Sequence, residues 1–262
     1  MDLIELKKAI ENKFGIFYHE DKNYLLKSRV SDVMLEYNLQ SYDKVAEQMY
    51  RQNDHEFLDK IANCVTTRET FFFRNPNVYN VFFSDVLTTY PKDKPIKIWS
   101  AGCSTGQEPY SIAMGISEKY PHQIPNISII GSDISPEAIA KAKKGIYTEF
   151  ELSRGLSEHQ ISSFFTKSDR YYQISESIQT IVSFKKENLL QINPRPFFDI
   201  IFFQNVAIYF KGDFRRKIIQ NISNYLVPGG VLIIGSSENL SDYLSEMKLV
   251  KSGMMFFYRK EA

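Results

Sequence analysis

A short apolar run that enters a glycine-containing turn and leaves it as a helix constrains this chain more than any other feature. The run from Ile96 to Trp99 is typical of a buried strand, and a helical pattern follows the turn. Gly102 and Gly106 allow the backbone to turn tightly and to approach a ligand, and Pro109 lies where the first turn of a helix tolerates it. This arrangement predicts a nucleotide-binding loop with Gly102 beside the ligand.

An acidic residue, Asp133, follows the next predicted strand at residues 126–132. In doubly wound folds a carboxylate at this place binds the ribose of the cofactor. A single Asp after a strand is more often part of a helix cap, and the neighbouring Ser135 and Pro136 would suit that role. Its spacing from the glycine loop favours the ribose, so the loop and the acid together predict an adenosyl cofactor.

Strands and helices alternate through the C-terminal two thirds of the chain. The predicted strands are 96–101, 126–132, 181–184, 198–203 and 231–235, and the predicted helices are 107–119, 136–144 and 213–226. A turn is expected at 227–230, and the strands 249–250 and 254–258 are expected to form a terminal antiparallel pair around Gly253. This α/β pattern, with a mostly parallel sheet, resembles the class I methyltransferase fold, which is Rossmann-like.

The first third of the chain has a purely helical pattern, because apolar residues recur at three- and four-residue spacings from about residue 2 to residue 83. Ser41 and Asp54 are predicted to cap two of these helices. The polar, proline-bounded stretch 91–95 marks a break. We therefore expect an all-helical domain at 1–85, a linker at 86–95 and a cofactor domain at 96–262, with a small inserted lobe near 156–180.

Composition excludes several classes of protein. The chain has 262 residues and a net charge of +1, so nothing in its overall charge attracts nucleic acid or anionic lipid. Its two cysteines, Cys64 and Cys103, cannot form a disulfide framework and have no neighbours at metal-ligand spacing, so we expect no metal. Without a signal sequence or a long apolar stretch, we expect a cytoplasmic protein that does not insert into a membrane.

The loop also satisfies the Gly-x-Ser-x-Gly pattern of a hydrolase nucleophile elbow, through Ser104. A triad of Ser104, Asp133 and His159 can be written in the order that such enzymes use. His159, however, lies in a stretch that has the pattern of a surface helix before the third parallel strand, whereas the triad histidine should follow a late strand. The hydrolase interpretation is therefore disfavoured.

Polar residues at the ends of later strands add to the candidate site. Asn188 follows the third predicted strand, Gln204 and Asn205 end the fourth, and Tyr209 lies shortly after them. The carboxyl ends of these strands border the crevice in which open α/β sheets bind ligands. Before the linker, three phenylalanines hold Arg74 near the cofactor domain, where its planar guanidinium can bind a carboxylate.

Six ordered motifs resemble the chemotaxis receptor glutamate O-methyltransferases, the CheR family, over nearly the whole chain. They are Thr-x-x-Thr-x-Phe-Phe-Arg at 67–74, Ser-Ala-Gly-Cys-Ser-Thr-Gly-Gln-Glu-Pro-Tyr-Ser at 100–111, Ser-Asp-Ile at 132–134, Asn-Leu-Leu at 188–190, Asn-Val-x-Ile-Tyr-Phe at 205–210 and Gly-Ser-Ser-Glu-Asn at 235–239. The resemblance implies S-adenosylmethionine as methyl donor, S-adenosylhomocysteine as product, and receptor glutamates as acceptors. The residues that it places around the cofactor are Arg68, Thr70, Arg74, Glu108, Asp133, Asn188, Leu189, Gln204 and Asn205.

By the same resemblance, Arg74 and Tyr209 are the best candidates for the reacting centre. Arg74 would orient a carboxylate, either that of the acceptor or that of the cofactor, and Tyr209 would position the methyl group. A glutamate is already ionised near neutral pH and needs no general base to attack a sulfonium methyl group. Such an enzyme has to supply geometry and a dry site, which agrees with the lack of an obvious acid–base pair.

Three departures from the family pattern bear on specificity. Gln204 stands where members commonly have Arg, and the second helix adds Asp32 and Glu36 beside Lys27 and Arg29. No glycine lies between Leu156 and Lys211, so the hairpin lobe at 166–177 has the character of a shortened form. We expect a monomer that recognises the cytoplasmic helices of a chemoreceptor without a pentapeptide tether. A different carboxylate acceptor, and a non-catalytic sensor of the cofactor or its product, remain alternatives.

Overall fold

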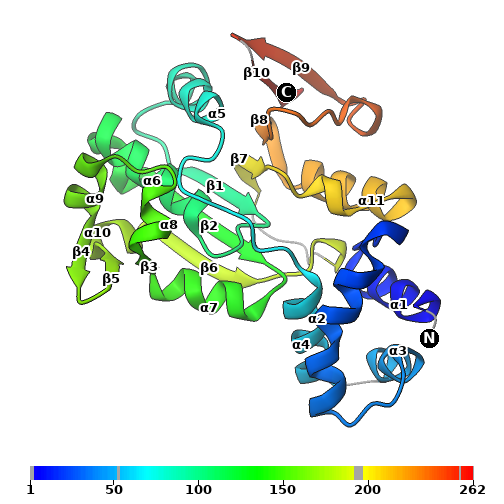
Figure 1. Cartoon of the computed structure of the whole chain (residues 1–262). Coiled ribbons are helices and arrows are strands. Elements are labelled where there is room, and N and C mark those ends of the chain that lie inside the picture. The colour runs from blue at the N-terminus through cyan, green and yellow to red at the C-terminus, as the bar shows by residue number, and fades with distance from the viewer. Residues whose placement is uncertain (1–2, 52–53, 192–196, 254, 262) are drawn as a thin grey trace.

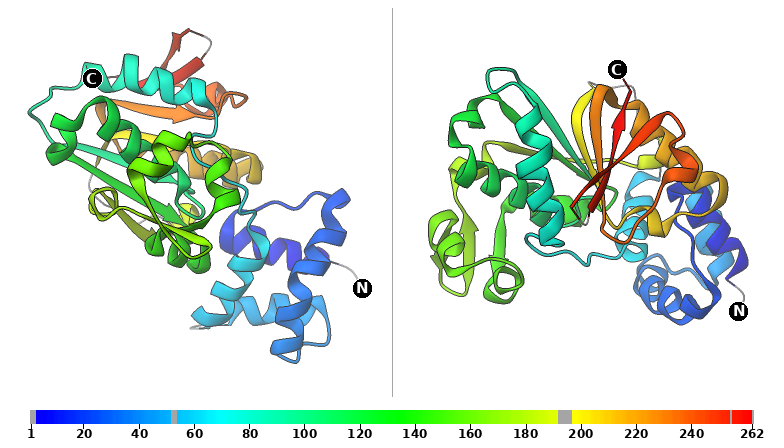
Figure 2. Two further views of the ribbon diagram at one scale, coloured as in Figure 1. Left: turned by 60° about the vertical axis from the view of Figure 1, so that its left-hand side comes forward. Right: turned by 90° about the horizontal axis from the view of Figure 1, so that it is seen from above.

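The computed structural model describes residues 3–51, 54–191, 197–253 and 255–261. Four N-terminal helices, in blue, lie beside one end of a central sheet, and a small lobe lies at another end (Figure 1). Two further views show the same separation between the N-terminal helices and the lobe (Figure 2). Among the described residues, no helix combines the length and apolar character needed to span a bilayer.

Seven strands form the central sheet in the order β6-β2-β1-β7-β8-β10-β9. Their bounds are β1 Ile96–Ala101, β2 Ile127–Asp133, β6 Val182–Lys186, β7 Phe198–Phe203, β8 Leu226–Ile234, β9 Met247–Ser252 and β10 Met255–Lys260. The first five run parallel, and β10 pairs antiparallel with β8 and β9. This confirms the predicted α/β fold with its terminal antiparallel pair.

The parallel strands are buried on both faces, which is why they read as continuous apolar runs. Alternate residues point to different cores: Trp99 and Ile201 face the N-terminal helices, whereas Ile98 and Ile200 face the other side. Helices α6 Gln107–Lys119, α7 Pro136–Lys144 and α11 Gly212–Asn224 connect the strands and cover the sheet (Figure 1). Parallel strands require such crossover connections.

The N-terminal helices are α1 Ile4–Phe14, α2 Asn23–Glu36, α3 Tyr42–Tyr50 and α4 His55–Val65. Ser41 and Asp54 cap α3 and α4, as predicted, because their side chains accept hydrogen bonds from the backbone N–H groups of Lys44 and Phe57. The purely helical expectation is wrong at one point, since Ile16 forms a β-bridge with Phe210 beyond β7. That bridge ties the N-terminal part to the sheet.

The chain from residue 72 to residue 89, which the sequence pattern groups with the N-terminal helices, packs elsewhere. It forms α5 Pro76–Val81, a π-helical turn Phe82–Val86 and a 3₁₀ turn Leu87–Thr89. Phe72, Phe82 and Leu87 are buried in the core on the opposite face of the sheet from α1–α4. The domain limits 1–85 and 96–262 stay a prediction, and this packing favours a junction nearer residue 66.

A separate three-stranded antiparallel sheet, ordered β3-β5-β4, builds the lobe between α7 and β6 (Figure 1). Its elements are β3 Ile146–Thr148, α8 Glu149–Ser153, α9 Glu158–Phe164, β4 Phe165–Ser168, β5 Tyr171–Ile174 and α10 Glu176–Gln179. The hairpin between β4 and β5 turns at Asp169, whose φ of 55° takes the left-handed conformation that glycine usually supplies.

The expected turn at 227–230 is also wrong, because β8 begins at Leu226 and runs through it. The pairing with β7 shifts register there: Phe198 pairs with Leu226, but Ile200 pairs with Val231. The Pro-Gly-Gly segment is thus a bulge inside the strand, which strands tolerate at Pro and Gly. The predicted final strand starts at Met254, which lies outside the described residues; β10 begins at the next one.

Candidate functional site

A cleft that opens to solvent lies at the carboxyl ends of β1, β2, β6 and β7. Because β1 lies between β2 and β7, this is the point at which the order of the parallel strands reverses, where open α/β sheets bind ligands. The candidate site residues that line it are Thr70, Arg74, Gly102, Glu108, Asp133, Asn188, Leu189, Gln204, Asn205 and Tyr209.

The glycine loop passes close to the end of β7. Gly102 has a φ of 81°, its N–H donates to the carbonyl of Ser132 at 2.8 Å, and a Cβ placed on it would lie 2.6 Å from Cγ2 of Val206. Two residues later, Ser104 has a φ of 50°. Both the backbone conformation and the lack of space therefore require glycine at position 102.

Asp133 is held by two backbone N–H groups. Its Oδ2 accepts from Ser104 N and its Oδ1 from Ser135 N, each at 2.9 Å. Burial raises the pKa of this carboxyl, while those hydrogen bonds and the charge of Arg68 oppose the rise. The predicted acid thus lies in the cleft with a fixed orientation, at the junction of the glycine loop and the start of α7.

Glu108, in the first turn of α6, is the second acid of the cleft. Its Oε1 accepts from Ser100 Oγ at 2.6 Å, and its Oε2 accepts from Nε2 of Gln204 at 2.7 Å. Burial raises the pKa of Glu108 to about 7, although these two hydrogen bonds and the charge of Arg74 lower it. The Oε1 atom of Gln204 in turn accepts from Asn75 at 3.4 Å, so Gln204 links two walls of the cleft.

Arg74 comes from the segment between the N-terminal helices and α5. Its Nη1 donates to the carbonyl of Glu69 at 3.0 Å, and its guanidinium lies 5.8 Å from the ring centroid of Phe71. The residues on both sides have left-handed backbones, with φ of 48° at Phe73 and 61° at Asn75. Non-glycine residues in this conformation cost free energy and gather at functional sites.

Tyr209 is positioned by the N-terminal part of the chain. It ends the 3₁₀ turn Ala207–Tyr209 after β7, and its carbonyl accepts from Phe17 N at 2.8 Å. Next to it, Phe210 forms the β-bridge with Ile16. The N-terminal segment therefore closes one side of the cleft and fixes the backbone that carries the tyrosine.

Asn188 lines the cleft, but its amide is already engaged. Its Nδ2 donates to the carbonyl of Lys13 at 2.7 Å, and its Oδ1 accepts from Leu190 N at 3.0 Å. The side chain thus joins α1 to the loop after β6. It holds the neighbouring Leu189 in the wall of the cleft instead of presenting a free amide edge.

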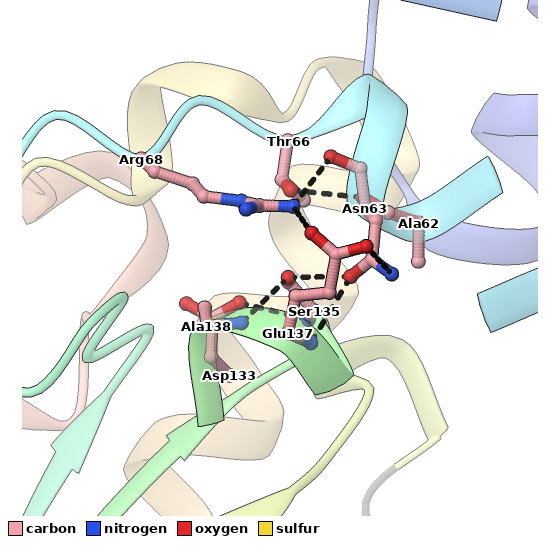
Figure 3. A network of polar contacts seen from close by, with 8 residues as sticks. All are labelled: Ala62, Asn63, Thr66, Arg68, Asp133, Ser135, Glu137 and Ala138. Atoms are coloured by element: carbon pink, nitrogen blue, oxygen red, sulfur yellow. Dashed lines mark hydrogen bonds and ion pairs between the residues drawn. The ribbon is translucent and has the colours of Figure 1, made fainter. Parts of the chain in front are cut away.

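Arg68 is the candidate that does not line the cleft. Its Nη2 donates to Glu137 Oε2 at 2.8 Å and to the carbonyl of Asn63 at 3.2 Å (Figure 3).

The hydrolase triad is not assembled either. Ser104 and Asp133 share the cleft, but His159 is exposed on α9 in the lobe.

The sequence missed part of the lining. Apolar residues from the helical region, Phe14, Ile16 and Val65, form one wall, and Glu187 adds another acid. Phe14 and Ile16 carry no signal beyond a helical or core pattern, so only the folded structure assigns them to the cleft. The place of Glu187 directly after β6 was the one signal that could have identified it.

The cleft chemistry fits a ligand that carries an amine, a carboxylate and hydroxyl groups. Asp133 and Glu108 can accept hydrogen bonds and attract a cation, and Arg74 can bind a carboxylate. Ser104 Oγ and Asn205 Oδ1 are buried without a hydrogen-bond partner. Buried polar atoms of this kind are unfavourable unless a ligand or water satisfies them.

Comparison with known proteins identifies the family. Residues 68–256 match the CheR methyltransferase SAM-binding domain, and residues 1–66 match the CheR methyltransferase all-alpha domain. A chemotaxis protein methyltransferase of Vibrio anguillarum is 32% identical over 97% of this chain and 95% of its own length. Chemotaxis protein methyltransferase 1 of Vibrio cholerae is 33% identical over 96% and 94%, respectively.

Among solved structures, the N-methyltransferase NodS of Bradyrhizobium japonicum with S-adenosylhomocysteine is similar over 84% of this chain and 98% of its own, at 14% identity and a TM-score of 0.46. That likeness is too remote to support an argument. The two domain matches together cover almost the whole sequence, and they meet close to the start of the Arg74 segment. This chain therefore belongs to the CheR family of S-adenosylmethionine-dependent chemotaxis methyltransferases.

Proposed function

We propose that this protein transfers the methyl group of S-adenosylmethionine to glutamate side chains of a chemoreceptor, forming methyl esters in sensory adaptation. The observation that carries the proposal is the composition of the cleft, where Arg74 and Tyr209 meet the acids Glu108 and Asp133 and no histidine is among the described lining residues. A glutamate needs no base, because it is ionised near neutral pH. An amine acceptor would have to lose a proton first.

Each side chain has a defined task in this proposal. The cofactor supplies an electrophilic methyl group on a sulfonium. Asp133 binds the ribose hydroxyls, Glu108 attracts the amino group of the methionine part, and Thr70, Asn205 and Leu189 complete the wall. Arg74 orients a carboxylate, and Tyr209 positions the methyl group for in-line attack. The apolar wall from the N-terminal region keeps water away from the reacting atoms.

Gln204 replaces the arginine expected at this position, yet it keeps the cleft assembled. Its amide bonds both Glu108 and Asn75. This supports an enzyme with a formed cofactor cleft. A non-catalytic sensor and a different carboxylate acceptor are the alternatives that the experiment must distinguish.

The proposed partner is the cytoplasmic helical region of a chemoreceptor, bound by a cytoplasmic monomer without a pentapeptide tether, nucleic acid or membrane insertion. Helix α2 offers a mixed surface. Lys27, Asp32 and Glu36 are exposed at different points around the helix, and Glu36 pairs with Lys60 of α4. Arg29 instead turns inward to Tyr18 Oη at 3.1 Å and Val65 O at 3.3 Å. Such a surface fits receptor helices that carry both signs of charge.

The test is transfer of a radiolabelled methyl group from S-adenosylmethionine to receptor cytoplasmic fragments. The proposal expects label on the receptor that mild base removes, because glutamyl methyl esters hydrolyse under those conditions. A receptor fragment with its glutamates replaced by alanine is the matched control and should stay unlabelled. Binding of S-adenosylhomocysteine without transfer would point to a sensor, and label on another carboxylate protein alone would point to a different acceptor.

A further inference from the structure

A polar network joins helix α4 of the N-terminal region to the start of α7 (Figure 3). Its centre is Asn63 on α4. The Oδ1 atom of Asn63 accepts from Ser135 Oγ at 2.7 Å and from Glu137 N at 3.2 Å, and its Nδ2 donates to Glu137 Oε1 at 3.1 Å. A single amide thus satisfies three groups in the first turn of a helix from the other part of the chain.

The same network reaches the acid of the cleft. Ser135 is fully buried, its Oγ caps α7 by accepting from Ala138 N at 3.1 Å, and its N–H donates to Asp133 Oδ1 at 2.9 Å. The hydroxyl of Ser135 donates its one proton to Asn63 Oδ1, so Asn63 determines which way that hydroxyl points. Without this acceptor a buried donor would lose its partner, which costs free energy.

Arg68 closes the outer side of the network. It bonds both Glu137 and the backbone carbonyl of Asn63. The side chains of this ion pair are 37% and 62% exposed, so the pair is worth little by itself. The contacts between Asn63, Ser135 and Asp133 therefore carry the connection, and Arg68 acts from the surface.

We propose that Asn63 is a positioning residue for cofactor binding, which aligns Asp133 through Ser135 and so couples the docking of the N-terminal helices to the ribose site. The proposal rests on the assignment of Asp133 to the ribose. It goes beyond the transfer reaction because it assigns part of the cofactor affinity to the Asn63 side of α4, a helix of which Val65 is the one described residue that lines the cleft.

The experiment is calorimetric titration of S-adenosylhomocysteine into the full chain and its variants. Asn63→Ala should weaken binding about tenfold, the size expected when a buried hydroxyl donor loses its hydrogen-bond acceptor. Asp59→Asn is the matched control: Asp59 also lies on α4 and crosses to the sheet, through an ion pair with Lys186 at 2.6 Å. Lys186 is next to Asp133 in the pairing of β6 with β2, but the Asp133 carboxylate takes its hydrogen bonds from Ser104 N and Ser135 N. Its affinity should stay within about twofold of wild type.

A second ligand separates positioning from general loosening. The 2′,3′-dideoxy analogue of S-adenosylhomocysteine lacks the hydroxyls that Asp133 would bind. Removing them should cost wild type and Asp59→Asn much affinity, but should cost Asn63→Ala and Asp133→Ala far less. The double variant N63D/E137Q, which keeps an acceptor for Ser135 and a donor opposite it, should regain most of the affinity and covers the case in which Asn63→Ala folds poorly.

Two results would overturn the inference while leaving the proposed function intact. One is an equal loss of affinity in Asn63→Ala and Asp59→Asn, and the other is an unchanged cost of removing the ribose hydroxyls in Asn63→Ala. If wild type itself bound no S-adenosylhomocysteine, the proposed function would fail, and this inference with it.

Discussion

At the scale of single residues, the cleft is a set of charges in a partly dry environment. Glu108 is hydrogen-bonded twice, yet burial still raises its pKa to about 7. Asp133 has a raised pKa for the same reason, although its two oxygens accept backbone hydrogen bonds. Ionising such a buried carboxyl group costs free energy in the free protein, and a cation bound beside it makes the ionised form favourable.

The first prediction concerns the pH dependence of cofactor binding. Below pH 7 Glu108 holds a proton in the free protein, and a ligand with a positive amino group favours the ionised form. Binding then has to release that proton, so affinity for S-adenosylhomocysteine should fall about tenfold per pH unit below pH 7 and level off above it. Titration calorimetry from pH 5.5 to 7.5 measures this. Glu108→Gln should flatten the dependence of affinity on pH. An unchanged slope in this variant would assign the pH dependence to another titrating group.

The second prediction concerns Arg74. Its side chain is partly exposed, donates to the backbone carbonyl of Glu69 and lies over the Phe71 ring, so its loss should harm folding little. Arg74→Ala should lower kcat/KM about a hundredfold, because a charge-assisted contact to a carboxylate is lost. The kcat/KM of Arg74→Lys should lie between those of wild type and Arg74→Ala, because lysine keeps the charge but cannot present a planar pair of N–H donors. Arg170→Ala, at the exposed hairpin tip, is the control. Equal activity in the two alanine variants would remove Arg74 from the site.

At the scale of elements, the loops at the strand ends store backbone strain. Left-handed non-glycine residues flank Arg74, and others lie at Ser104 and Asn205, all around the cleft. The loop after β1, the turn after β7 and the segment before α5 are therefore held by their contacts with one another. Such strain persists where the surrounding structure fixes it and is typical of sites that must be preorganised.

The third prediction separates the two reasons for glycine at position 102. Gly102 and Gly229 have nearly the same φ, 81° and 79°, but a Cβ would meet Val206 at the first and nothing within 4 Å at the second. Gly229→Ala should cost about 1 to 2 kcal/mol of unfolding free energy from backbone conformation alone. Gly102→Ala should cost about 2 kcal/mol more, from overpacking. Urea unfolding measures both, and equal losses would mean that Val206 moves aside freely.

At the scale of the whole molecule, the N-terminal helices and the sheet share one core. Leu6, Ile10 and Phe57 from the helices belong to the same buried cluster as Trp99 and Phe203 from the strands. The cluster also contains the apolar residues of α11, namely Ile218, Ile219 and Ile222. The two parts are therefore not separate bodies joined by a linker, and the cleft lies along their junction.

The fourth prediction follows from this shared core. Deleting residues 1–66 would expose a face of the sheet and α11, and each large apolar side chain that is uncovered costs about 1.5 to 3 kcal/mol. The fragment should therefore bind the dye ANS and unfold without a cooperative transition, whereas the full chain should give coincident transitions by fluorescence and circular dichroism. A fragment that folds cooperatively and binds S-adenosylhomocysteine would show that the core divides.

Much of this fold could be predicted from local patterns. The sequence predicts the strands near 96, 127 and 198 to within a residue or two, because buried parallel strands form apolar runs with glycine or acidic residues at their ends. The Pro-Gly-Gly segment predicts a turn but forms a bulge within β8, because turns and bulges favour the same residues. The pattern of residues 72–87 predicts packing with the N-terminal helices, which is wrong, because helical periodicity indicates that a face is buried but not which element covers it.

The sequence by itself determined the strand–loop–helix unit, the acid after the second strand and the motifs that resemble the family, because these depend on residues near one another in the chain. Only the tertiary structure decided that Arg68 turns away from the cleft to bind Glu137 and that Asn188 donates to the carbonyl of Lys13. It also decided that Asn63 is connected to Asp133 by hydrogen bonds through Ser135. These contacts join residues far apart in sequence, and a side chain's partner is set by which surfaces pack together, not by its neighbours along the chain.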